Sequence, residues 1–453
     1  MAQWRTDLNE YKQPHNVHLF EVNMIAGTDG TLISNTNPMA VIGNTPNYRG
    51  IPVLTVDDDT VQHTSKNRRK VSNYEIIDYA SFQSTTQTDV WDQKITGTAN
   101  AVFDQYKGMV QLSVGSSTGD QIIRQTKRVV RYIPGRQSEV TMSVIFGQPT
   151  TGVRRRFGIF DDLNGAFFED AGDGEYYVVC RRNTAGGPVE VRIPRSQWNM
   201  DKLDGTGSSG ITANPLAIQL MVIEYEWYGA GQVEFKFIID NNAYSVHQFN
   251  HANIDTTPWA STAFLPVRIE LTNVAGTAGT HTCFQGSHSV LQEGQFGKIG
   301  SQLNASSPIT GKTLTDANVF YPIVSIRLKS TDLNGVVIPT SFTSATLDNT
   351  NIFFRIIRNA TLTGGTWVSV GADSHVEYNI TQTAITSGEI LLTGFITGGS
   401  QGNIYRFDDE ITTQLARRTV TNLGDTSDTF TVAIAATGSN KDGFASLAWT
   451  EVR

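Results

Sequence analysis

The sequence predicts an all-β fold, in which an extended N-terminal arm precedes a β-sandwich and a second, smaller β-sandwich. The 453-residue chain has 41 glycines and only 17% charged residues, a composition typical of sheets joined by many tight turns. Apolar residues recur with a period of two in segment after segment. A helical period is missing from the larger sandwich, apart from one or two turns expected at 195–205.

The arm is predicted over residues 1–75. Its stretch 27–60 has closely spaced Asn, Gly and Pro, which favour turns and extended chain and leave little apolar surface to bury. We therefore expect a partner to order this arm.

The first sandwich is predicted over residues 76–295. The segments "EVTMSVIFG" (139–147), "QVEFKFIID" (232–240) and "VRIELTN" (267–273) each alternate apolar and polar residues. Strands of this kind have one core face and one wet face, which is the pattern of antiparallel sheets stacked as a sandwich.

A linker is predicted at 296–318, where Gly, Ser, Asn and Thr predominate. Alternation resumes in "PIVSIRLKS" (322–330) and continues through "NIFFRIIRN" (351–359) and "TFTVAIAATG" (429–438). The sequence therefore predicts a smaller β-sandwich over 319–453.

Charge and hydropathy limit the classes of partner that the sequence predicts. The net charge is -8 and the pI about 5.5, so we expect no nucleic-acid partner, and basic clusters such as 124–136 are interpreted as solubilising sheet faces. No run approaches eighteen apolar residues, and the first residues lack a signal-peptide pattern, so we expect folding in the cytosol and no membrane partner. Cys180 and Cys283 are then expected to be reduced thiols.

The acidic stretch 156–183 is predicted to form two successive hairpins. Asn164-Gly165 and Asp173-Gly174 supply the structural turns, because these residues tolerate positive φ. The spacing does not fit a helix-loop-helix calcium site. A lectin-like calcium site built from loop carboxylates and Asn164 is the alternative reading.

Candidate chemistry begins with Glu224 and Glu226, which lie at i and i+2 on one strand. Such a pair could serve as proton donor and nucleophile of a glycoside hydrolase, or be only the solvated end of the strand. The possible metal ligands are His247 with His251, and a looser cluster of His281, Cys283 and His288. We interpret them as ordinary polar residues and expect no metal and no cofactor.

Four aromatic residues are the preferred ligand-binding candidates: Trp198, Trp227, Tyr228 and Trp259. They are expected at strand ends or in loops, where contacts with sugars or proteins form readily. The alternative is that they close the ends of the core.

Four phrases of the first sandwich stand out: "RYIPGRQSEVTMSVIFG", "GIFDDLNGAFFED", "VRIPRSQWNMDKLDGTGSSGI" and "HQFNHANI". In sequence and in order they resemble a family of β-rich virion proteins of tailed bacteriophages, with relatives in some giant viruses. "YPIVSIRLKSTDLNGVVIPTSFT" and "GTLISNTNPMAV" extend the resemblance over most of the chain. It implies a jelly-roll, lectin-like first sandwich but no catalytic residues.

The resemblance implies a non-enzymatic virion structural protein, such as a tail fibre, baseplate or other appendage component. Its expected partners are other virion proteins through the arm, further copies of itself in a trimer, and a host-surface glycan. Assembly in the host cytoplasm and residence in the virion follow. A capsid decoration or cement protein, a glycan-binding adhesin and a polysaccharide depolymerase using Glu224 and Glu226 are the alternatives.

Overall fold

The computed structural model describes residues 73–452, with gaps at 295–299, 334, 347–348, 399–402, 408–416 and 419–425. Nearly all of the predicted arm (1–75) thus lies outside the described residues. The all-β prediction is confirmed, because thirty strands and a single 3-10 turn, η1 (Arg195–Gln197), make up the regular structure of this part of the chain. No helix in these residues is long and apolar enough to cross a membrane.

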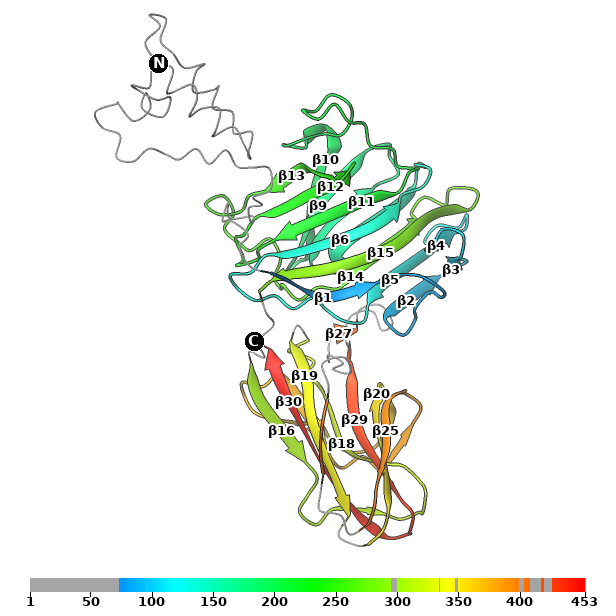
Figure 1. Cartoon of the computed structure of the whole chain (residues 1–453), viewed down its shortest axis with the longest axis vertical. Coiled ribbons are helices and arrows are strands. Elements are labelled where there is room, and N and C mark those ends of the chain that lie inside the picture. Colours follow the sequence, from blue (N-terminus) through cyan, green and yellow to red (C-terminus); the bar gives the residue numbers. More distant parts are fainter. Residues whose placement is uncertain are drawn as a thin grey trace, which may run out of the picture. The chain divides into compact units, whose positions relative to one another are not determined.

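The first β-sandwich consists of two facing antiparallel sheets (Figure 1). The larger sheet has the order β13-β12-β11-β6-β15-β4-β3, and β1 pairs with the C-terminal half of the long strand β15. Its strands are β1 (Tyr74–Ala80), β3 (Asn100–Asp104), β4 (Met109–Val114), β6 (Ser138–Ile145), β11 (Gln219–Tyr225), β12 (Val233–Ile239), β13 (Asn242–Phe249) and β15 (His281–Glu293).

The opposing sheet has the order β10-β9-β8-β7-β14-β5-β2. Non-sequential neighbours, such as β14 between β7 and β5, show that the chain crosses repeatedly between the layers, as in a jelly roll. Its strands are β2 (Trp91–Thr96), β5 (Gln121–Thr126), β7 (Val153–Phe160), β8 (Gly165–Asp170), β9 (Tyr176–Thr184), β10 (Gly187–Pro194) and β14 (Val267–Asn273).

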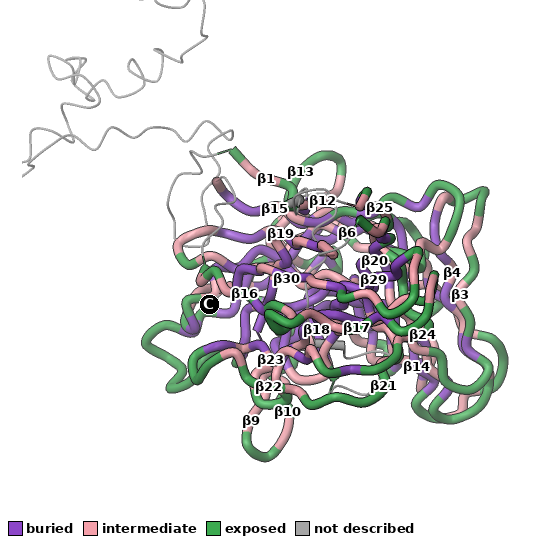
Figure 2. The backbone as a smooth tube through the Cα atoms, turned by 90° about the horizontal axis from the view of Figure 1, so that it is seen from below, coloured by how far each residue is buried: buried purple, intermediate pink, exposed green. Residues whose placement is uncertain are grey.

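The core lies between these sheets, where the alternation predicted it. In β6, Val140, Met142 and Val144 are buried in the core while the intervening residues are partly exposed. Figure 2 shows the buried segments concentrated in the strands and the exposed ones in the connecting loops. The opposing sheet differs from the prediction: all of β14 is buried, including Arg268 and Glu270, because ion pairs rather than water cover its outer face.

The second sandwich has its own core between a five-stranded and a six-stranded sheet. The first contains β16 (Ser301–Ser306), β17 (Lys312–Leu314), β19 (Val336–Thr346), β26 (Asn403–Arg406) and β30 (Lys441–Val452). The second contains β18 (Tyr321–Leu328), β20 (Ile352–Arg358), β22 (Val368–Ser369), β23 (Val376–Asn379), β25 (Glu389–Ile396) and β29 (Thr429–Ala436). Two small ribbons pair β21 (Thr361–Thr363) with β24 (Ala384–Thr386) and β27 (Arg417–Arg418) with β28 (Thr426–Ser427).

The segment predicted as a linker (296–318) contains two strands of this sandwich. β16 and β17 both pair with β30. Their sequences, "SQLNAS" and "KTL", are too polar and too short to show a clear alternation. Their place is determined by β30, which pairs with both strands although it begins only at Lys441.

Candidate functional site

The acidic stretch forms the two predicted hairpins, β7–β8 and β8–β9. The first turn differs from the Asn-Gly prediction, because Phe160 pairs directly with Gly165 and the loop between them has four residues, 161–164. Asp161 holds this loop by accepting the backbone N–H groups of Leu163 and Asn164 at 2.8 and 2.7 Å. Gly165 has φ +140° and Asn164 has no positive φ.

Asn164 has a different structural role from the one predicted. Its side-chain Oδ1 accepts hydrogen bonds from the backbone N–H groups of Asn183 and Ser261 and from the Ser261 hydroxyl, at 3.1, 2.8 and 2.9 Å. Asn164 thus ties the β7–β8 loop to two distant segments. In the second turn Gly174 does adopt positive φ, and Asp173 accepts from Glu175 N–H and Tyr177 Oη.

The strand-borne carboxylates of this stretch pair with arginines. Arg155 contacts Asp170 at 2.6 Å and Arg156 contacts Glu169 at 2.5 Å. Arg268 contacts the loop carboxylate of Asp162 at 2.6 Å. Burial works against the charge of Arg268, but Glu270 and Asp162 outweigh it, so the pKa of this guanidinium is raised.

Ion pairs form a layer on the outer face of the opposing sheet, which we call the Arg–Glu layer and to which Arg155 and Asp170 do not belong. Its members are Arg156, Glu169, Arg181, Glu190, Arg192, Arg268 and Glu270. The guanidinium groups of Arg156 and Arg181 lie over the Phe167 ring at 5.0 and 4.9 Å from its centre. Cation–π contact and ion pairing together seal Phe160 and Phe167 from water.

The calcium alternative meets carboxylates that already have partners, since Asp161 caps the loop and Asp162 binds Arg268. Among the residues that the structure describes, no group of three or more His, Cys, Asp or Glu side chains is placed to hold a metal ion.

A row of three glutamates crosses the outer face of the larger sheet. Glu224 on β11 lies directly opposite Glu139 on β6 and Glu234 on β12. All three alternate with core residues, so their side chains project away from the core. Like charges in directly opposed positions repel and need a counter-charge.

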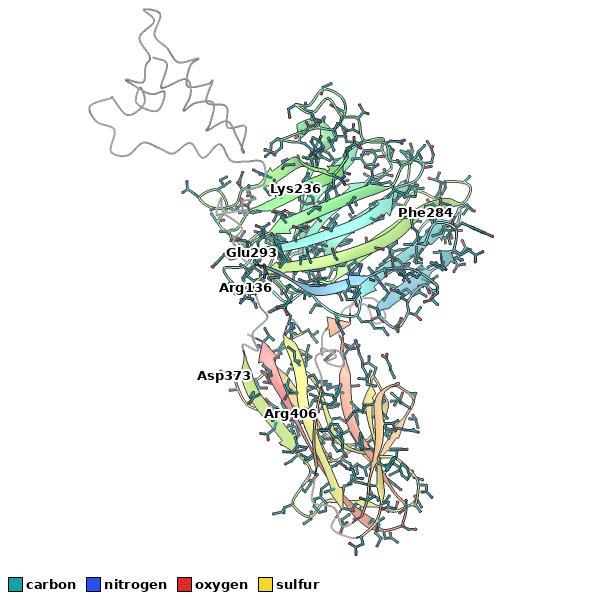
Figure 3. All side chains as sticks on the ribbon, in the orientation of Figure 1. Arg136, Lys236, Phe284, Glu293, Asp373 and Arg406 are labelled. Atoms are coloured by element: carbon teal, nitrogen blue, oxygen red, sulfur yellow. The ribbon has the colours of Figure 1, made fainter. Side chains whose placement is uncertain are left out.

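Lys236 supplies that counter-charge. Its Nζ lies 3.0 Å from Glu224 Oε1 and 3.2 Å from Glu234 Oε2. Burial acts to lower the pKa of Lys236, but the two glutamates raise it above its ordinary value. Gln137 donates to the second oxygen of Glu224, and Gln248 donates to Glu234 Oε1 at 3.2 Å. Figure 3 shows Lys236, Glu293 and Arg136 toward one end of the strands and Phe284 toward the other.

The predicted pair Glu224 and Glu226 does not form an open catalytic couple. Glu226 follows the end of β11 and is fully buried, whereas Glu224 is bound to Lys236 and Gln137. Sequence reasoning missed that Glu139 and Glu234 flank Glu224. Each was visible as a polar position in an alternating strand, but only the strand register places them side by side.

Three of the four aromatic candidates pack inside the fold, contrary to the expected exposure. Trp198 and Trp259 are buried, and Trp227 is half-buried. Trp198 and Trp227 donate their indole N–H groups to the carbonyls of Ile193 and Ala260 at 3.3 and 3.0 Å. These large rings close the ends of the core, as the alternative reading held. Tyr228 is 52% exposed and has a positive φ of 35° in the β11–β12 loop.

A small, partly open pocket lies at the end of the first sandwich that Trp198 closes. Its charged groups are engaged: Glu169 by Arg156 and Arg192, and Arg195 by the carbonyls of Lys202 and Leu203. The pocket therefore offers mainly apolar contact. Its lining consists of Phe146, Phe168, Glu169, Tyr176, Tyr177, Arg195, Trp198, Ala213, Pro215, Gln219 and Phe237.

The histidines and cysteines have local structural contacts. His247 Nδ1 accepts the Asn199 N–H at 3.2 Å, and burial lowers the pKa of His247 to about 4. His251 contacts Asp255, and His288 contacts Asp78. Cys180 and Cys283 are unpaired and buried, on β9 and β15 of different sheets, and burial raises the pKa of both thiols.

No family model and no curated protein matches the sequence. Similar solved structures include a legume lectin-like domain from Entamoeba histolytica (13% identity, 48% of this chain and 98% of that chain, TM-score 0.29). Another is a Bacillus licheniformis beta-glucanase (13% identity, 50% of this chain and 98% of that chain, TM-score 0.31). A third is the CBM2 module of the evolved Dit of Lactobacillus casei BL23 phage J-1 (9% identity, 49% of this chain and 96% of that chain, TM-score 0.33). At these identities the likeness concerns strand arrangement alone, and the jelly-roll description rests on the strand order given above.

Proposed function

We propose that this chain is a non-enzymatic structural protein of a virus particle. The observation that carries the proposal is that side chains suited to chemistry are used to hold the fold. Glu224 is bound by Lys236 and Gln137, and the acidic stretch is bound by arginines. Such a protein needs no cofactor and presents a rigid scaffold to its neighbours.

The assignment to a virion comes from the resemblance of the phrases at 131–147, 158–170, 191–211 and 247–254 to tailed-phage proteins. Three of these phrases contribute structural features: the β7–β8 hairpin, the η1 turn with Trp198, and the His251 segment, whose imidazole ring stacks against Trp259. They are therefore requirements of the fold, in keeping with a structural family.

The test is the composition and structure of purified particles. We expect the chain in gradient-purified particles at a fixed copy number, and density for both sandwiches in cryo-electron microscopy maps. Its presence in the lysate but absence from purified particles would contradict the proposal. Density in the tail would favour an attachment role, and density on the capsid lattice would favour a decoration role.

A second candidate function is glycan binding at the rim of the first sandwich. Tyr228 supports it, because its ring is exposed beside half-buried Trp227 and its backbone is fixed by a hydrogen bond from Tyr228 N–H to Tyr132 Oη at 3.2 Å. A rigid exposed ring is suited to stacking on a sugar. On a glycan array, binding by the wild type that is lost in Tyr228→Ala would support this function, and no binding above background would remove it.

A further inference from the structure

Strand β10 is the edge of the opposing sheet, and in the described part of the chain it pairs with β9 alone. Its sequence is GPVEVRIP. Val189 and Val191 are 51% and 53% exposed, although they lie on the side of the sheet that faces the core, where Val191 is paired with the buried Cys180. An apolar edge strand of this length is a template for pairing with another strand.

The two prolines fix which backbone groups face outward. Proline lacks an N–H and in edge strands occurs where that position faces away from the neighbouring strand. Pro188 and Pro194 have the same parity, so the even-numbered residues direct their N–H and C=O groups outward. Glu190 and Arg192 therefore hold the outward N–H groups between the prolines.

The same segment is complementary to itself. In an antiparallel pair of two β10 strands centred on Val191, Glu190 lies opposite Arg192 of the second copy, and Val189 lies opposite Ile193. Both Glu190–Arg192 positions then exchange N–H···O=C bonds, while the prolines fall outside the paired segment. The arrangement is two-fold symmetric, so each favourable pair occurs twice.

The side chains on both faces suit this arrangement. On one face, the exposed Val191 meets its symmetry copy and the exposed Val189 meets Ile193 of the second copy, so that apolar surface is removed from water. On the other face, Glu190 and Arg192 are part of the Arg–Glu layer, with side chains that remain 24% and 37% exposed. Their remaining exposed area allows the layer to continue across the junction without breaking its internal pairs.

We propose that β10 is a homotypic interface, at which two copies of this chain join their sheets by antiparallel pairing about Val191. This pairing does not depend on the virion proposal, and its two-fold symmetry differs from the trimer expected from the sequence. A contact of this kind buries less than a standard interface of about 1,600 Å², so association in the micromolar range is expected.

The test is disulfide trapping in the full chain. Val191→Cys puts a thiol on the two-fold axis. In the pairing with the second copy this is a non-hydrogen-bonded position, where opposed Cα atoms lie about 4.5 Å apart, a separation that a disulfide can span. Val102→Cys on edge strand β3 is the matched control, because Val102 is also an exposed valine, at 52%. The native cysteines are buried and should not compete.

We expect mild oxidation at micromolar concentration to convert most of Val191→Cys, and little of Val102→Cys, into a covalent dimer. Equal yields from the two variants would overturn the proposal. Sedimentation velocity provides a second measurement: wild type should associate with rising concentration, and Val191→Lys should weaken association at least tenfold while Val102→Lys does not. A wild type that stays monomeric at all concentrations, or a trimer unaffected by Val191→Lys, would also overturn it.

Discussion

Gly165 provides the sharpest test of the hairpin between β7 and β8. It combines a φ of +140° with an extremely close approach to its partner strand. A Cβ added at this position would lie 2.1 Å from Phe160 Cβ, 2.3 Å from Phe160 Cα and 2.4 Å from the Ile159 carbonyl oxygen. Since two of these atoms are backbone, no side-chain rotation relieves the contact, and the paired strands must separate.

Gly174, in the next turn, is the matched control. It also has a positive φ, of 91°, but an added Cβ would meet no atom within 4 Å. Gly174→Ala should therefore cost only backbone strain, about 1 to 2 kcal/mol. Gly165→Ala adds overpacking worth about 1 to 3 kcal/mol, for a total of about 2 to 5 kcal/mol.

Urea denaturation followed by tryptophan fluorescence measures both values, and hydrogen exchange of peptides from β7 and β8 localises the effect. We expect Gly165→Ala to lower the free energy of unfolding by at least 1 kcal/mol more than Gly174→Ala. Equal losses in the two variants would show that the close approach of Gly165 to Phe160 does not constrain the fold.

Three further predictions use other parts of the first sandwich. Burial lowers the pKa of His247 to about 4, from an unfolded value near 6.5. The free energy of unfolding should therefore be highest above pH 6.5 and fall by about 1 to 2 kcal/mol toward pH 4, a figure reduced for solvent screening. His247→Gln should flatten this part of a pH-dependent melting profile. Lys236→Met should lower the free energy of unfolding, measured by urea denaturation, by about 3 kcal/mol because Glu224 and Glu234 lose their shared counter-charge. Adding Glu224→Gln should restore part of this lost stability, and no restoration would argue against the ion pairs of Lys236 with the two glutamates. Trp259→Ala should cost about 3 to 5 kcal/mol and Tyr228→Ala under about 0.5 kcal/mol by the same measurement, with similar losses contradicting the assigned burial.

The sequence was sufficient for the strands that alternate cleanly. β6, β12 and β14 lie where a period of two placed them, because each must bury one apolar face. It was insufficient for β16 and β17, whose polar sequences acquire their place from β30. Local pattern specifies a strand but not its partner.

The candidate site follows the same division. Glu224 was identified from its own strand, but the row with Glu139 and Glu234 depends on register between strands distant in sequence. The exposure of the tryptophans was wrong for a related reason. Trp198 and Trp259 occur in polar loop sequences, yet the loops fold back so that the rings cover the core ends. Residue type alone does not distinguish a rim aromatic that faces a ligand from one that faces inward.

The Arg–Glu layer has a consequence for how this protein can change. Most of its arginines contact more than one carboxylate or aromatic ring; Arg156, for example, contacts Glu169, Glu190 and Phe167. A single substitution there breaks several partnerships and leaves buried charges uncompensated. New recognition properties can therefore arise at low cost in the rim loops. We expect natural sequence variation of this protein to concentrate in those loops and to spare the outer face of the opposing sheet, including Glu190 and Arg192 on its edge strand β10.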